Sequence, residues 1–93
     1  MFVLHVGIVM KNGQAKAAEE VFAGIFRPAI RSQEGFDHVE FLRNNASGEY
    51  ILSIGFESET LQRKWVATDL HQEVWPLMEQ NFLRYDLKTF TSV

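Results

Sequence analysis

The chain contains no cysteine among its 93 residues, which excludes disulfides, thiolate metal ligands and cysteine nucleophiles. Basic residues are also scarce, because the 9 lysines and arginines are scattered and are outnumbered by 12 acidic residues. A nucleic-acid-binding domain normally carries a clustered basic surface, so we expect no nucleic-acid partner. No apolar run approaches the roughly 20 residues that a membrane-spanning helix needs, so we expect no membrane contact.

The first residues lack the basic start and the small-residue cleavage site of a secretory signal peptide, so we expect a cytoplasmic protein. The length favours a single domain over residues 1–93. A domain of this size buries only about 60–65% of the surface of its unfolded chain. Hydrophobic residues nevertheless make up 46% of the sequence, so part of this apolar surface is expected to be buried against a second copy of the chain.

Four segments predict β-strands. Residues 2–10 are apolar and β-branched, which is typical of a strand. Residues 36–44 and 49–56 flank a stretch rich in Asn, Ser and Gly, and this arrangement predicts a hairpin. The last strand is expected over residues 82–91, where apolar and charged residues alternate.

Two regions between these strands predict helices. Residues 14–33 place their apolar side chains at helical spacing along one stripe that includes Ile25. Pro28 predicts a kink in this helix, because proline lacks an N–H and its ring presses on the carbonyl group four residues earlier. In the second region, Ser58 is expected to cap a first helix and Asp69 a second one, so the helix is broken between them.

The second of these helices contains Pro76, which predicts that it is bent or short. The resulting order, β-α-β-β-α-β, is that of the ferredoxin-like α+β fold, a four-stranded antiparallel sheet with helices on one face. We expect the uncovered face to present His5 from the first strand and Val39 and Phe41 from the second. Exposed apolar faces of this size are rare in monomers, so the sequence predicts a homodimer in which two sheets cover each other.

Several motifs follow one another along nearly the whole chain. Residues 11–13 are similar to a Lys-Pro-Gly turn, with Asn12 in place of proline, and residues 34–43 to a Pro-Gly-Cys…Tyr-Glu-Leu-Phe-Arg strand. Residues 50–57 are similar to a Phe-Leu-Leu…Trp-Glu strand, and residues 65–71 to the helix signature His/Trp-Leu-x-Ser-x-x-His. In this order and spacing, the motifs resemble those of the antibiotic biosynthesis monooxygenase family, which belongs to the dimeric α+β barrel superfamily.

The resemblance implies a homodimer with a separate pocket in each subunit, between the helices and the sheet. It also implies a cofactor-independent monooxygenase that uses O2, without flavin or metal, to oxidise a small phenolic or quinol-like aromatic molecule. Two alternatives are a non-catalytic dimer that binds small molecules and a haem-binding or haem-degrading protein. Trp75 and Val6 stand where the haem-degrading members carry their haem-ligating histidine and an asparagine, which disfavours the haem alternative.

Trp65 and His71 are the residues that we expect to be catalytic. Trp65 would form a flat wall for an aromatic ring, and His71 would accept a phenolic proton, because the unperturbed pKa of histidine lies near neutrality. The sequence is equally compatible with Trp65 as an anchor of the core and His71 as a surface residue at a helix start. The expected substrate-binding residues, which are equally good core residues, are Trp75, Phe22, Phe26, Leu52, Ile54 and Val6.

The remaining polar residues predict no second site. The three histidines are isolated in the sequence, and none stands at a ligand spacing from another, so we expect no metal site. His38 is expected to be solvated, and no Ser/His/Asp triad is suggested by the spacing. Tyr85 carries a hydroxyl group whose position relative to the pocket the pattern leaves open.

Overall fold

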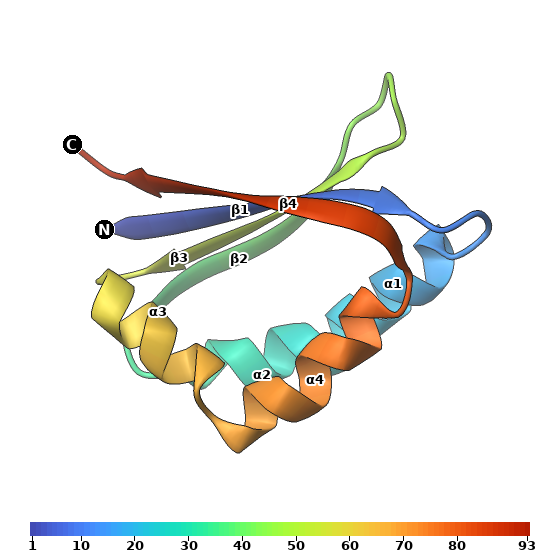
Figure 1. Cartoon of the computed structure of the whole chain (residues 1–93). Helices are drawn as coiled ribbons and strands as arrows, with labels where there is room; N and C mark the ends of the chain where they lie inside the picture. Colours follow the sequence, from blue (N-terminus) through green and yellow to red (C-terminus); the bar gives the residue numbers. More distant parts are fainter.

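The computed structural model describes residues 1–93, and it consists of one antiparallel sheet with all helices on one side (Figure 1). The strands run in the order β2-β3-β1-β4, so β2 and β4 form the two edges of the sheet. This arrangement confirms the predicted ferredoxin-like α+β fold. The strand bounds agree with the predicted ones within one residue: β1 (Phe2–Met10), β2 (Phe36–Arg43), β3 (Tyr50–Phe56) and β4 (Phe82–Thr91).

The first helical region consists of α1 (Ala15–Val21), the π-helical turn η1 (Phe22–Phe26) and α2 (Arg27–Arg31). The predicted kink at Pro28 is therefore replaced by a π turn directly before it, in which the Arg27 N–H donates to the Phe22 carbonyl, five residues earlier. Because Pro28 has no N–H to donate, a wider turn here costs the helix little. The same turn rotates Ile25 off the predicted apolar stripe, and its side chain is exposed.

The second helical region consists of α3 (Glu59–Val66) and α4 (Asp69–Glu79). Ser58 caps α3 as predicted, since its hydroxyl group accepts from the Leu61 N–H at 3.2 Å. The predicted cap of α4 was wrong by one residue: Thr68, and not Asp69, accepts from the His71 N–H at 3.1 Å. Pro76 predicted a bent or a short helix, and the second alternative was wrong, because α4 continues through Pro76 to Glu79.

The core lies between the helices and the face of the sheet that they cover. The helix-facing residues of β3 are all buried there, and they alternate with residues that face away. The buried apolar cluster comprises Val6, Ile8, Phe22, Phe26, Ala29, Ile30, Tyr50, Leu52, Ile54, Phe56, Trp65, Val74, Met78 and Phe82.

None of the helices is both long enough and apolar enough to span a membrane.

The predicted orientation of β2 was wrong. Val39 pairs with Ile54 and Phe41 with Leu52, so both side chains lie on the helix side of the sheet and pack against the core. An irregularity between Phe36 and His38 inserts an extra residue into β2. A shift of one residue moves every later side chain to the opposite face, and this is why the simple alternation failed.

Candidate functional site

A cavity of about 180 Å³ lies between α3, α4 and the β1–β4 half of the sheet. Its walls are almost entirely apolar, and its polar side chains are those of Gln62, His71 and Tyr85. An apolar cavity with few polar groups is the usual form of a site for a small organic ligand. The lining residues are Leu4, Val6, Phe26, Ile54, Gln62, Trp65, Val66, His71, Trp75, Tyr85 and Leu87.

Thr68 fixes the two central residues of this cavity relative to each other. Its hydroxyl group donates to the Trp65 carbonyl at 2.7 Å and accepts from the His71 N–H at 3.1 Å. The end of α3 is thereby tied to the start of α4. As a result, the His71 ring meets Trp65 edge to face, with the ring centroids 5.0 Å apart and an angle of 84° between the planes.

The His71 imidazole is held between two indole rings. On its other side it lies nearly parallel to Trp75, at 14° and a centroid distance of 6.2 Å. Burial lowers the pKa of His71 below its ordinary value, so the ring is neutral at neutral pH. Its Nδ1 atom is buried and has no hydrogen-bond partner in the chain. A buried polar atom without a partner costs free energy, so this nitrogen is an unusual feature of the residues around the cavity.

One residue of the π turn, Phe26, lines the cavity. Phe26 is almost fully buried and contacts Trp65 and Trp75, with ring centroids 6.2 Å and 6.0 Å away. Both contacts are inclined, as aromatic rings prefer. Since π turns are frequent at functional sites, the position of this one agrees with a ligand site at the indole rings.

Tyr85 forms part of the outer wall. Its ring stands at 83° to that of Trp75, and its hydroxyl group donates to the Glu79 carboxylate at 2.6 Å. That hydrogen bond, together with burial, raises the pKa of Tyr85. The hydroxyl group is thus engaged by Glu79, which leaves His71 and Gln62 as the polar groups of the cavity without side-chain partners.

The structure brings six of the eight predicted site residues together. Trp65, His71, Trp75, Phe26, Ile54 and Val6 line the cavity. Leu52 does not, because it is completely buried in the core. Phe22 does not either, because it faces a separate hollow of about 300 Å³ with Phe41 and Tyr50.

Sequence reasoning missed four lining residues and left the position of a fifth, Tyr85, open. Gln62 precedes Trp65 by three residues on α3, a spacing that places both on one helix face and could have identified it. Tyr85 and Leu87 are two residues apart and lie on the same face of β4, but the sequence does not show how far the helices extend over an edge strand. The remaining missed residues are Leu4 and Val66.

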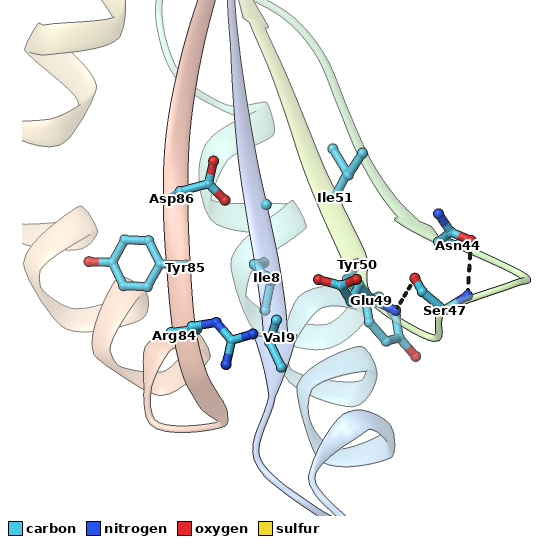
Figure 2. A pocket seen from close by; sticks show the side chains of 11 residues that line it. Ile8, Val9, Asn44, Ser47, Glu49, Tyr50, Ile51, Arg84, Tyr85 and Asp86 are labelled. Atoms are coloured by element: carbon cyan, nitrogen blue, oxygen red, sulfur yellow. Dashed lines mark hydrogen bonds between the residues drawn. The ribbon is translucent and has the colours of Figure 1, made fainter.

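A larger hollow of about 330 Å³ lies on the opposite face of the sheet, beside the β2–β3 loop (Figure 2). Arg84 and Asp86 extend from β4 toward β1, and the Asp86 carboxylate lies over Gly7, where a side chain would collide with it. This hollow is lined by charges of both signs and has no aromatic cluster comparable to that of the His71 cavity. The helix-side cavity is therefore the better candidate for an aromatic ligand.

A Ser/His/Asp arrangement does occur, although the spacing had suggested none. The Asp37 carboxylate lies 2.8 Å from His38 Nδ1, and His38 Nε2 lies 3.4 Å from Ser53 Oγ. Ser53 is only 8% exposed, and these residues line none of the hollows of the molecule. The arrangement fixes His38 on the sheet rather than forming a reaction site. No three His, Asp or Glu side chains converge to hold a metal ion.

Comparison with known proteins agrees with these features. Residues 1–75 match the family model described as "Antibiotic biosynthesis monooxygenase". No curated protein matches the chain by sequence.

Solved structures are similar to the chain over almost its entire length. SnoaB, a cofactor-independent oxygenase from Streptomyces nogalater, is 18% identical, with a TM-score of 0.83 over 99% of this chain and 93% of that one. A conserved protein from Methanosarcina mazei Go1 is 9% identical, with a TM-score of 0.84 over 96% and 89% of the two chains. A protein from Mycobacterium tuberculosis is 10% identical, with a TM-score of 0.82 over 99% and 94%.

Proposed function

The chain belongs to the antibiotic biosynthesis monooxygenase family, and on this basis we propose that it oxidises a small phenolic or quinol-like aromatic molecule with O2 in the His71 cavity. One observation carries the proposal. The His71 ring lines an apolar cavity between two indole rings, and its buried Nδ1 atom has no hydrogen-bond partner in the chain. SnoaB, a structural neighbour, is a cofactor-independent oxygenase, which supports the same reaction class.

The size and the walls of the cavity define the class of ligand. A volume of about 180 Å³ is smaller than the roughly 300–1,000 Å³ that drug-sized ligands occupy, so the ligand has one or two rings. Trp65 and Trp75 both line the cavity, and aromatic rings attract one another edge to face or stacked, so the walls favour an aromatic ligand. Gln62 and His71 are available to bind its oxygen atoms.

His71 acts as the base in the proposed reaction. Because burial lowers its pKa, the imidazole is unprotonated at neutral pH and accepts the proton of a bound hydroxyl group. The resulting anion is electron-rich enough to give one electron to O2. The two radicals then combine, and a carbon–oxygen bond of a hydroperoxide forms.

The second half of the reaction returns the proton. An imidazolium in this apolar cavity is unstable, so His71 gives its proton to the hydroperoxide as the oxygen–oxygen bond breaks. One oxygen atom stays on the ring and the other leaves as water, so a hydroquinone becomes a hydroxyquinone. The substrate supplies all four electrons that O2 accepts. The reaction as proposed therefore requires no external reductant and no cofactor.

Oxygen uptake with a panel of hydroquinones and naphthols tests the proposal. Wild-type protein should consume O2 with at least one of them, and His71→Ala should reduce kcat by about 100-fold or more, as expected for loss of a general base. His38→Ala is the matched control, because His38 lies outside the cavity. Saturable quenching of tryptophan fluorescence without any oxygen uptake would instead identify a non-catalytic binding protein.

A homodimer is the second part of the proposal. The face of the sheet without helices carries the exposed side chains of Leu42, Ile51 and Phe90. A second copy of the chain that covers this face would remove them from water, which is the main source of stability in protein association. Light scattering tests this point, and a mass near 10.7 kDa, that of one chain, would contradict it.

A further inference from the structure

A second hollow on the helix side of the sheet differs in chemistry from the His71 cavity. It has a volume of about 300 Å³ and lies between α1, η1 and the β2 edge of the sheet. Its lining residues are Glu19, Phe22, Phe41, Arg43 and Tyr50. The His71 cavity contains no carboxylate and no guanidinium, whereas this hollow contains one of each. None of its residues takes part in the proposed oxidation.

Three aromatic rings form the wall of this hollow. The Phe41 ring contacts both of the others, with its centroid 5.1 Å from that of Phe22 and 4.8 Å from that of Tyr50. Phe22 and Tyr50 are buried and Phe41 is half-buried, so the core holds the rings in place. Such a wall favours a ligand that itself has a ring, because aromatic groups attract one another stacked or edge to face.

The carboxylate of the hollow is already engaged. Glu19 accepts a hydrogen bond from the Tyr50 hydroxyl group. That bond is the main reason why the pKa of Tyr50 is raised; burial and the charge of Glu19 act in the same direction, and Arg43 acts in the opposite one. The phenol is therefore neutral at neutral pH. Although Arg43 is close enough to influence Tyr50, it forms no ion pair with Glu19.

Two guanidinium groups beside the rings have no acidic partner. Arg43 lines the hollow, and Arg27 lies over the Phe22 ring, 5.5 Å from its centroid. Neither forms an ion pair within the chain, and both are exposed to solvent. A planar guanidinium binds a carboxylate through two parallel hydrogen bonds. Since the two cations outnumber the carboxylate of Glu19, the local charge favours an anionic ligand.

We propose that this hollow binds a small aromatic carboxylate, with its ring against Phe41 and its carboxylate on Arg43. The aromatic wall distinguishes such a ligand from an inorganic anion, and Arg43 distinguishes it from a neutral phenol. In the His71 cavity a carboxylate would lose its hydration without meeting a permanent cation. The two sites therefore take ligands of different charge, and this inference does not depend on the proposed reaction.

The π turn places the two sites next to each other, so the experiment has to locate the ligand. Phe22 lines the hollow and Phe26 lines the His71 cavity, and their rings are stacked with centroids 6.4 Å apart. A ligand in either site will therefore change the NMR signals of this turn. Signals of Arg43, which lines only the hollow, and of His71, which lines only the cavity, distinguish the two.

An NMR titration of the full chain with benzoate tests the inference. Benzoate should shift the signals of Phe41 and Arg43, and Arg43→Gln should weaken its binding by about tenfold or more, because a charged hydrogen-bond partner is lost. The matched control is Arg31→Gln, which removes an exposed arginine that lines no hollow and should bind benzoate as the wild type does.

A second variant should change binding in the opposite direction. Glu19→Gln removes only the negative charge of the hollow, so it should strengthen benzoate binding by about two- to fivefold. Benzamide, which has the ring without the charge, and acetate, which has the charge without the ring, should each bind more weakly than benzoate. Glu19 and Arg43 are exposed, so the spectra of both variants should show the wild-type fold.

Three results would overturn the inference. The first is an absence of saturable benzoate binding. The second is binding that shifts the signals of His71 and is unchanged in Arg43→Gln, which would place benzoate in the other cavity. The third is binding of tetramethylammonium that Glu19→Gln weakens, which would make the hollow a site for cations. No turnover is measured, so a protein that binds benzoate at Arg43 but consumes no O2 would refute the proposed function alone.

Discussion

Replacing Gly35 with alanine should destabilise the fold where α3 is attached to the sheet. Gly35 has a φ of +77°, and a Cβ atom added there would lie 3.0 Å from Cβ of Leu61 and would overlap the end of that side chain. The left-handed backbone costs a non-glycine residue about 1–2 kcal/mol, and overpacking costs about 1–3 kcal/mol more. We therefore expect a loss of about 2–5 kcal/mol, a large part of the roughly 5–15 kcal/mol of a typical domain.

Gly48→Ala is the matched control, because Gly48 has almost the same φ, +76°, but no atom lies within 4 Å of its added Cβ. It should lose only the backbone part, about 1–2 kcal/mol. Urea unfolding of both variants measures the difference; at a slope of about 1.5 kcal/mol per M, a loss of 3 kcal/mol lowers the midpoint by about 2 M. Equal losses in the two variants would refute the role assigned to Leu61, which precedes Gln62 and Trp65 on α3.

Two further predictions concern the residues around His71. Thr68→Val removes the cap of α4 and the hydrogen bond to the Trp65 carbonyl, so it should lower the free energy of unfolding by about 1–2 kcal/mol and weaken binding of the aromatic probe 2-naphthol. The control Ser58→Ala, which removes the cap of α3 outside the cavity, should lose similar stability but retain binding. Equal losses of binding in the two variants would contradict this prediction. The pKa of His71 is lower in the folded state, so the unfolded chain binds a proton at this imidazole more readily than the folded chain does. The contribution of the neutral ring to stability is therefore fully present above the ordinary histidine pKa of about 6.5. It is lost as the pH falls through the pKa of the folded state. Urea midpoints from about pH 7.5 to about pH 5 should show this loss in the wild type and a smaller one in His71→Asn, and identical profiles would argue against a buried neutral imidazole.

Much of the fold could be predicted from the sequence because periodicity and turn residues act locally. The strand bounds and the break between α3 and α4 follow from such local patterns. The orientation of β2 could not be predicted, because one extra residue between Phe36 and His38 reverses every later side chain, and alternation alone does not reveal a bulge. The cap of α4 was wrong for a related reason: Thr68 and Asp69 are adjacent and are both good caps, so only the backbone decides.

The cavity was predictable in type but not in extent. Trp65 and His71 were identified through the resemblance of residues 65–71 to a family signature, and Trp75 lies four residues after His71; the structure places all three around one cavity. Phe22 and Leu52 share the same apolar faces, but position along a strand or helix determines which residues line a cavity, and hydrophobic pattern contains no such information. The exposure of Leu87 could not be predicted from the sequence either, because it depends on how far the helices extend over β4.

Turnover under 18O2, followed by mass spectrometry of the product, tests the proposed monooxygenase reaction most directly. With a hydroquinone that supports oxygen uptake, one labelled oxygen atom should appear in the quinone product and the other in water. His71→Ala should form little of this product, whereas His38→Ala should form as much as the wild type. A product without label, or hydrogen peroxide in place of labelled product, would contradict the assignment of a monooxygenase to this cavity.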